Sequence, residues 1–188
     1  MSSSGTSLPY RVQEGTFVEY ISGKNTTDDD LRATNNDSQL VGGGGNDILR
    51  GGKGNDILVG GSGDDKLYGG ASADQFRFFG NQIDGASDTD AIYDLNFGYG
   101  DTLVFGQYNG LFSTDAPGLN GFASGDSAII STYEGLAAAY EAPGGRITFT
   151  GNPTSNLLII SFDNGAGATQ TLRITGGYDA FVSELTLS

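Results

Sequence analysis

Large apolar residues recur at intervals of nine along one stretch of the chain, at Leu49, Leu58, Leu67 and Phe76. The residues around each of them alternate polar, apolar and polar, or nearly so. This pattern predicts a very short β-strand whose apolar residue points inward. The residues between these strands are rich in glycine and polar side chains and therefore predict turns. A fixed period of this kind indicates a repeat architecture.

Written in nines from Gly42, the stretch reads GGGGNDILR, GGKGNDILV, GGSGDDKLY and GGASADQFR. Glycines recur at the first, second and fourth positions, and an aspartate recurs at the sixth. Turn and strand alternate with no helix between them, which predicts a parallel coil of two facing sheets. Successive turns then lie on opposite edges, so that Asp47 is expected beside Asp65, and Asp56 beside Asp74.

Stacked aspartates are unfavourable without a cation, because two carboxylates about 4 Å apart at an effective dielectric constant of about 20 repel by roughly 4 kcal/mol. One large apolar side chain per repeat adds little stabilisation beside the entropy cost of ordering the backbone. Ca²⁺ takes about six to eight oxygens from carboxylates and carbonyls, and glycine-rich turns expose carbonyls. Mg²⁺ is less suited, because it keeps its waters and needs a stricter octahedron. The period therefore predicts Ca²⁺ between stacked turns.

The nines match the pattern G-G-x-G-x-D-x-U-x, with U a large apolar residue, so the stretch resembles the RTX (repeats-in-toxin) calcium-binding β-roll. The alternative interpretation, a flexible acidic linker, does not explain why aspartate and leucine stay in phase. We predict an all-β protein with a parallel β-roll over residues 24–77. An N-terminal capping segment with a strand at 17–21 is expected over residues 1–23, and a C-terminal antiparallel β cap over residues 78–188.

In the RTX family the calcium ligands are mainly the sixth-position aspartate and the carbonyls of the second and fourth residues. Ser72 replaces the fourth glycine of the last repeat, which leaves that carbonyl out of the expected set. The residues that the resemblance assigns as ligands are Gly43, Gly45, Asp47, Gly52, Gly54, Asp56, Gly61, Gly63, Asp65, Gly70 and Asp74. At the stoichiometry of the family, the stackable turns imply about three to five ions.

Two degenerate turns are expected upstream, at residues 24–32 and 33–41. They lack glycines but keep leucine at the eighth position and, in the first of them, Asp29 at the sixth. Ser38 replaces the aspartate of the second, so a site shared with Asp56 is expected to be weaker. The alternative interpretation of both segments is a polar loop.

After the repeats the chain reads DAIYDLNF at residues 90–97 and GYGDTLVF at residues 98–105. These residues resemble the D-x-I-x-D-[FL]…G-D-x-L-x-F segment that follows the roll in secreted RTX proteases and lipases, where it covers the exposed edge. The resemblance implies that Asp90 and Asp101 hold one more Ca²⁺. The alternative is that they cap turns.

The remainder of the chain predicts a short alanine-rich helix over residues 132–142 and three antiparallel strands at 146–150, 157–162 and 169–174. The tail over residues 178–188 mixes acidic, apolar and hydroxyl residues, as many type I export signals do. A final strand is the alternative interpretation of this tail.

The amino-acid composition excludes several classes of function. The net charge of −14 disfavours nucleic acid and anionic membranes as partners, and no stretch approaches the ~18 apolar residues of a membrane span. The absence of cysteine and histidine excludes disulfides, thiolate sites, the Ser-His-Asp triad and the usual general base. We therefore expect that the protein is not an enzyme.

We predict a monomeric calcium-binding module that folds when Ca²⁺ binds. The resemblance implies a secreted, extracellular protein, exported by type I secretion machinery, in which the module acts as a folding and secretion scaffold. The second hypothesis is a carbohydrate-binding or adhesive module whose partner is a polysaccharide. The tyrosines that would line such a face are Tyr68, Tyr93, Tyr99 and Tyr108, and half-buried packing is their alternative role.

Overall fold

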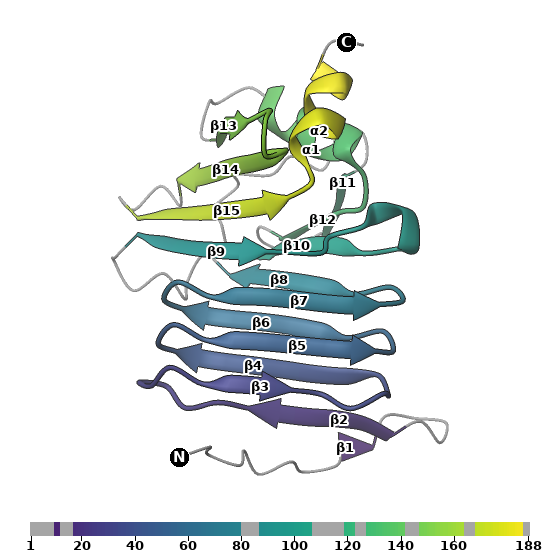
Figure 1. The fold of residues 1–188 in the computed structure, drawn as a ribbon, viewed down its shortest axis with the longest axis vertical. Helices are drawn as coiled ribbons and strands as arrows, with labels where there is room; N and C mark the ends of the chain where they lie inside the picture. The colour runs from purple at the N-terminus through teal and green to yellow at the C-terminus, as the bar shows by residue number, and fades with distance from the viewer. Residues whose placement is uncertain are drawn as a thin grey trace.

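A computed structural model of the chain describes residues 10–11, 17–79, 87–106, 119–122, 127–141, 147–163 and 168–185. In this part of the chain the strands stack in two facing sheets, and two α-helices lie near the C-terminal end (Figure 1). The strand order is β1-β2-β4-β6-β8-β10-β12-β11 in the first sheet and β13-β14-β15-β9-β7-β5-β3 in the second. The predicted all-β fold with a parallel roll is confirmed.

The strands of the roll alternate between the two sheets. The first sheet receives β2 (Phe17–Ser22), β4 (Ser38–Gly44), β6 (Ile57–Ser62) and β8 (Gln75–Phe79), and the second receives β3 (Asp30–Arg32), β5 (Ile48–Lys53) and β7 (Lys66–Ala71). Neighbours within a sheet are parallel and come from repeats two apart, so that Leu40 pairs with Leu58 and Leu49 with Leu67. Successive turns therefore lie on opposite edges, as the period predicted.

The strands of the repeats are longer than predicted. They begin at the seventh position and continue through the third position of the next nine, where Gly52 pairs with Gly70 in the second sheet and Gly43 with Gly61 in the first. Glycine lets the stacked backbones approach closely enough to pair there. The turn is therefore shorter than expected and consists of the fourth to sixth positions.

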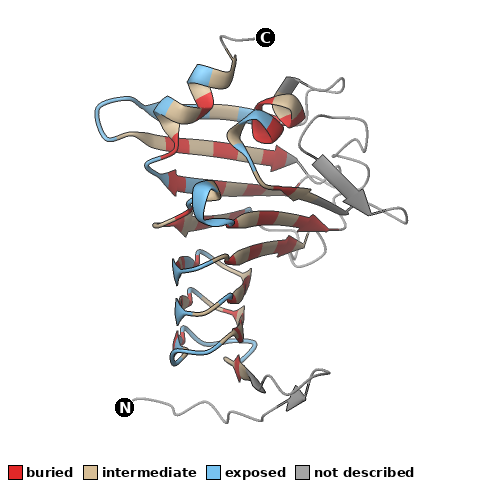
Figure 2. Cartoon of the chain, turned by 90° about the vertical axis from the view of Figure 1, so that its right-hand side faces the viewer, coloured by how far each residue is buried: buried red, intermediate tan, exposed pale blue. Residues whose placement is uncertain are grey.

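The eighth-position residues pack between the sheets. Figure 2 shows buried segments along the strands of the roll. The inward column of the first sheet consists of Ile21, Leu40, Leu58, Phe76, Leu103 and Ile130. The column of the second sheet consists of Leu31, Leu49, Leu67, Ile92, Ile174 and Leu158. All of these side chains are buried, which confirms that the position-eight residues point inward.

The segments on either side of the repeats extend the same sheets. Upstream, β3 lies in the first degenerate turn and β4 begins in the second, and β2 pairs with β4 where a strand was expected. β1 (Tyr10–Arg11) pairs antiparallel with β2. Downstream, β9 (Asp88–Ile92) adds to β7, and β10 (Thr102–Gly106) adds to β8. The segment after the repeats therefore covers the edges of both sheets, as its resemblance implied.

The C-terminal sheet region follows the prediction in part. β13 (Ile147–Asn152), β14 (Leu157–Asp163) and β15 (Thr169–Thr175) are antiparallel as expected, and β15 joins the roll by pairing parallel with β9. The expected helix is α1 (Tyr133–Glu141). The sequence did not predict β11 (Leu119–Phe122), β12 (Ser127–Ile130) or the short 3₁₀ helix η2 (Phe97–Tyr99).

The alternative interpretation of the tail, a final strand, is wrong, because Tyr178–Leu185 forms helix α2. Phe181 is fully buried, and Tyr178, Val182 and Leu185 pack against the core beside it. These spacings of three and four residues place the apolar side chains on one face of a helix. Neither α-helix of the described residues is long and apolar enough to cross a membrane.

Candidate metal sites

The sixth-position aspartates form two ladders, one along each edge of the roll. The first-edge ladder consists of Asp29, Asp47, Asp65 and Asp90, and the second-edge ladder of Ser38, Asp56, Asp74 and Asp101. In these ladders a carboxylate accepts a hydrogen bond from the backbone N–H of a residue in the turn below it. The Asp47 N–H donates to Asp65 Oδ1 at 2.7 Å, and the Asp56 N–H to Asp74 Oδ1 at 2.8 Å. The predicted stacking of turns two repeats apart is confirmed.

These aspartates are buried and only partly hydrogen-bonded. Asp47, Asp56, Asp65 and Asp74 are at most 1% exposed. The Oδ2 atom of each of them has no hydrogen-bond partner. Asp56 Oδ1 also lacks a hydrogen bond of good geometry, although the N–H and hydroxyl of Ser38 lie close enough to lower the pKa of Asp56. Buried carboxylate oxygens are costly unless they are hydrogen-bonded, paired or bound to a metal. Each repeat thus directs an unsatisfied oxygen into its edge of the roll.

Burial raises the pKa of these carboxyl groups. It raises the pKa of Asp47, and it brings the pKa of Asp56 to about 6, that of Asp74 to about 7 and that of Asp65 to about 8. Desolvation is the largest cause in every case, and neighbouring carboxylates add to it. In the absence of a cation, folding therefore makes the ionised form of these groups less favourable than it is in the unfolded chain.

The second and fourth positions bring stacked backbones into contact. Gly61 has a φ of +113°, and a Cβ atom placed on it would collide with the carbonyl oxygen of Gly43. Gly70 has the same relation to the carbonyl oxygen of Gly52. Ser72, which replaces the fourth glycine, adopts the same left-handed conformation, with a φ of +89°. The turn therefore keeps its shape at Ser72, although non-glycine residues rarely adopt this conformation.

The first-position glycine has a role that the sequence reasoning missed. A Cβ atom on Gly60 would collide with Oδ2 of Asp65, and the same holds for Gly42 and Asp47 of their own repeat. The oxygen affected is the one that lacks a hydrogen-bond partner. The period showed the glycine, but the role of the space beside it depends on the fold of the turn.

A second ladder, also missed, uses the fifth position. Asp28 Oδ1 accepts from the Asn46 N–H at 2.7 Å, and Asn46 Oδ1 accepts from the Asp64 N–H at 2.9 Å. On the other edge, Asp37 and Asn55 accept in the same way from the turns above them. These side chains are exposed or, at Asp37, half-buried, and all of them are hydrogen-bonded, so their role is to hold stacked turns together. The recurrence of Asp or Asn at this position was the available signal.

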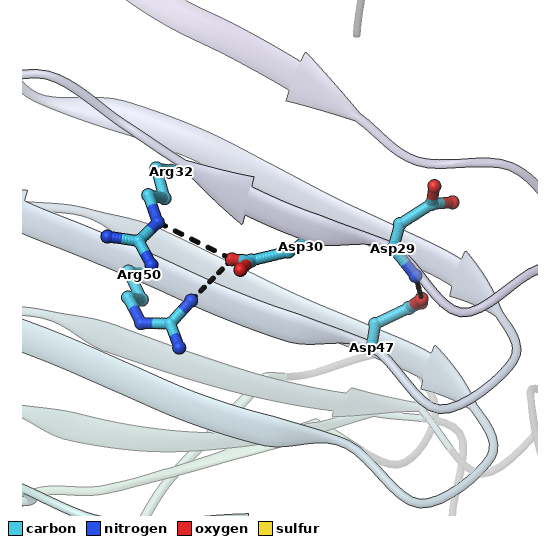
Figure 3. Close-up of polar contacts among 5 residues, drawn as sticks. All are labelled: Asp29, Asp30, Arg32, Asp47 and Arg50. Atoms are coloured by element: carbon cyan, nitrogen blue, oxygen red, sulfur yellow. Dashed lines mark hydrogen bonds and ion pairs between the residues drawn. The ribbon is translucent and has the colours of Figure 1, made fainter. Parts of the chain in front are cut away.

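The three consecutive aspartates at the start of the roll have three different roles (Figure 3). Asp28 belongs to the fifth-position ladder, and Asp29 donates its N–H to Asp47 Oδ1 at 2.7 Å. Asp30 points away from the turn and forms ion pairs with Arg50 and, at 3.6 Å, with Arg32. The structure thus separates a surface ion pair from the two ladders.

That Asp90 and Asp101 bind Ca²⁺ stays a prediction, but their positions argue against one ion shared by both. The two residues complete different ladders, because β9 continues the second sheet and β10 the first, so they lie on opposite edges. Both oxygens of Asp90 accept hydrogen bonds, from the Asp65 N–H and Gln170 Nε2, at 3.0 Å each. The geometry therefore favours the alternative, in which these two residues cap turns.

Asp101 and Asp94 close the second edge in the same manner. Asp101 accepts from the N–H groups of Asp74 and Asn96, and Asp94, which the sequence reasoning did not assign, accepts from those of Gly69 and Gly70. Within the described residues no three acidic side chains converge on one point. An ion at these edges would therefore need backbone carbonyls in addition to one or two carboxylates, which is chemistry that Ca²⁺ accepts.

Comparison with known proteins agrees with this geometry. The family of the RTX calcium-binding nonapeptide repeat matches residues 25–58 and 50–77, with four copies. The solution structure of the AlgE6R3 subunit from the Azotobacter vinelandii mannuronan C5-epimerase is similar over 84% of this chain and 75% of that chain, with 26% identity and a TM-score of 0.52. A search of curated proteins gave no match.

These findings define the class as a calcium-binding repeat protein with a β-roll fold. Residues 25–77 carry RTX calcium-binding nonapeptide repeats, and they form a β-roll. The findings point to a calcium-binding repeat module rather than to a catalytic domain, although the similar structure comes from an epimerase.

Proposed function

We propose that Ca²⁺ ions bind between stacked turns along both edges of the roll, and that the chain folds when they bind. The proposed carboxylate ligands are Asp47, Asp56, Asp65 and Asp74, and the proposed carbonyl ligands are those of Gly43, Gly45, Gly52, Gly54, Gly61, Gly63 and Gly70. The observation that carries the proposal is the buried Oδ2 atom of each of these aspartates, which has no hydrogen-bond partner. About three to five ions would bind.

The coupling of binding to folding follows from electrostatics. The buried aspartates oppose folding of the roll while no cation is present, because their charges are desolvated and repel one another. A cation that binds only the folded roll stabilises it by mass action. Since neighbouring turns share their edges, the ions are expected to bind cooperatively.

Folding of this kind suits a protein that leaves the cell before it folds. We infer that the module is exported by type I secretion machinery, remains loose where Ca²⁺ is scarce and folds in calcium-rich medium outside. It would then act as a folding and secretion scaffold of a secreted protein. The match to RTX repeats and the absence of cysteine support this inference.

Circular dichroism during calcium titration tests the proposal, with Mg²⁺ as the control ion. The expected result is a Ca²⁺-specific, cooperative gain of β signal. Replacing both Asp56 and Asp65 with alanine should shift the midpoint strongly to higher calcium concentration. A spectrum that Ca²⁺ does not change, or a midpoint that the double variant leaves in place, would contradict it.

A second candidate function, polysaccharide binding, rests on the outer face of the second sheet. The rings of Tyr68 and Tyr93 are stacked, with centroids 4.6 Å apart, and the Arg50 guanidinium lies 5.3 Å from the centre of the Tyr68 ring. Tyr93 is 40% exposed. Aromatic faces beside a guanidinium group suit a sugar that carries a carboxylate. The similar structure belongs to a mannuronan C5-epimerase, so mannuronan is the first ligand to test.

Retention on immobilised mannuronan, in the presence of Ca²⁺, tests this candidate. The Tyr93→Ala variant should be retained less than the natural chain. Tyr99→Ala is the matched control, because Tyr99 is 71% exposed and lies outside the stack. Absence of retention of the natural chain, or equal loss in both variants, would contradict the candidate. Tyr108 lies outside the described residues.

A further inference from the structure

The first-edge ladder ends at a strand that has no nonapeptide sequence. Above the turn at residues 60–65, the next layer is β9, whose buried and partly buried residues alternate. Asp88, Asp90 and Ile92 share the buried face of this strand. Two aspartates thus point into the roll at the level where a further glycine-rich turn would otherwise stack.

The two aspartates have different surroundings. Both oxygens of Asp90 are hydrogen-bonded, and the N–H of Thr89 between them donates to Asp64 Oδ1 at 3.0 Å. Asp88 is only 3% exposed, and neither of its oxygens has a hydrogen bond of good geometry, although the backbone N–H groups of Gly63 and Thr89 lie close enough to lower its pKa. In the turn below, Asp65 Oδ2 also lacks a partner. The junction therefore holds three buried carboxylate oxygens that the protein leaves unsatisfied.

The carboxylates at this junction raise one another's pKa. Desolvation is the main cause that raises the pKa of Asp88, to about 7, and the charge of Asp64 adds to it. The charge of Asp88 in turn contributes to the raised pKa values of Asp65 and Asp90. Within the described residues neither Asp88 nor Asp65 forms an ion pair. A buried, unpaired carboxylate of this kind calls for a cation.

We propose that Asp88, together with Asp65, holds a further Ca²⁺ ion at the junction between the last first-edge turn and β9, outside the nonapeptide repeats. The proposal deepens the calcium binding proposed above and rests on it. It gives the roll a metal site whose anchoring carboxylate comes from the segment that follows the repeats. Two carboxylates supplemented by backbone oxygens of the turn suit Ca²⁺, whereas Mg²⁺ needs a stricter octahedron.

The test counts the ions bound per chain at saturation, by equilibrium dialysis of the full chain against Ca²⁺ and elemental analysis. The Asp88→Asn variant should bind one ion fewer than the natural chain. Asp64→Asn is the matched control, since it removes the same charge from the same junction. Asparagine already occupies the equivalent fifth position at Asn46 and Asn55, where it caps an amide. This variant should keep the full number of ions.

Thermal unfolding gives a second readout that a merely structural role would not produce. In a chelator, Asp88→Asn should melt no lower than the natural chain, because it removes an unpaired buried charge. In Ca²⁺, it should gain less stability than the natural chain. An unchanged number of ions in Asp88→Asn, or an equal loss in Asp64→Asn, would overturn the inference. Failure of the natural chain to bind Ca²⁺ would instead overturn the proposed function itself.

Discussion

In the repeats the interior receives one large apolar side chain per nine residues, whereas β14 and β15 bury one at nearly every second position. Above the roll, Phe105 packs on Phe162, and Tyr140 and Phe149 pack on Phe181. The roll instead buries aspartates along its two edges. The comparison teaches that two parts of one continuous pair of sheets can depend on different interactions, apolar packing in one and counter-charge in the other.

Removal of Ca²⁺ should produce the largest difference between the two parts. We expect the amides of residues 24–77 to lose their protection against exchange in a chelator. At a Ca²⁺ concentration of about a hundred times its Kd, each site adds about 2.7 kcal/mol to the free energy of unfolding. The strands β13 to β15 should keep more of their protection, since their core is apolar. Hydrogen exchange followed by mass spectrometry checks this. Equal loss in both parts would show that they unfold as one unit.

A substitution in the apolar core of the C-terminal part should weaken that part without affecting the metal sites of the roll. Phe181→Ala removes a fully buried ring and should destabilise the C-terminal part by about 3–5 kcal/mol. The number of ions bound at saturation should stay at the value of the natural chain, because Phe181 lies outside the ladders. Unfolding by denaturant in excess Ca²⁺, together with an ion count, provides the measurement. Loss of ions in this variant would mean that the two parts depend on each other more than proposed.

Filling the space beside an unsatisfied oxygen should affect only the roll. In Gly60→Ala the new Cβ would meet Oδ2, Cγ and Cβ of Asp65, so the carboxylate must move. Overpacking of this kind costs roughly 1–3 kcal/mol, and calcium affinity should fall with it. Gly98→Ala, in η2, is the control, because the only atom near its Cβ is Asn96 Oδ1 at 3.1 Å. Calcium titration of both variants checks the prediction, and equal midpoints would contradict it.

Acid should stabilise the metal-free roll. The folded-state pKa values of about 6, 7 and 8 for Asp56, Asp74 and Asp65 lie above the ordinary value of 3.8. The protonated fold is therefore favoured below pH ~4, and its stabilisation is lost as the pH rises through 6 to 8. With Ca²⁺ removed by a chelator, the amides of the roll should be better protected against exchange at pH 5 than at pH 8. Calcium affinity should change in the opposite direction, because protons compete with Ca²⁺. A pH-independent titration midpoint would contradict this account.

Completing the second-edge ladder should have the smallest effect. The Ser38 hydroxyl donates to the Asn36 carbonyl oxygen at 2.7 Å. Ser38 also lies close enough to Asp56 to lower its pKa, but it supplies no carboxylate to this edge. Ser38→Asp would add the missing carboxylate and should lower the calcium midpoint several-fold, since ligand charge tunes affinity. Ser38→Asn, which adds the same volume without the charge, should not. A calcium midpoint that rises in Ser38→Asp would show that the added charge finds no ion.

The sequence predicted those features that depend on local spacing. The nine-residue period indicated the two inward columns and the pairing of Asp47 with Asp65, because side-chain type and period decide both. It did not indicate the role of Gly60, which depends on where the Asp65 carboxylate turns after folding. The helix α2 was missed although its apolar residues recur at helical spacing. Its eight residues are too short a stretch for the period alone to decide between helix and strand, and tertiary packing around Phe181 decides it.

The sixth-position ladder gives the roll a polarity. Each turn offers its N–H to a carboxylate 18 residues further on, and the last two turns offer theirs to Asp90 and Asp101, 25 and 27 residues further on. No turn is complete until the chain beyond it has arrived. If the chain left a compartment carboxyl end first, the segment with Asp90 and Asp101 would emerge before the repeats, and the roll would fold from its C-terminal end.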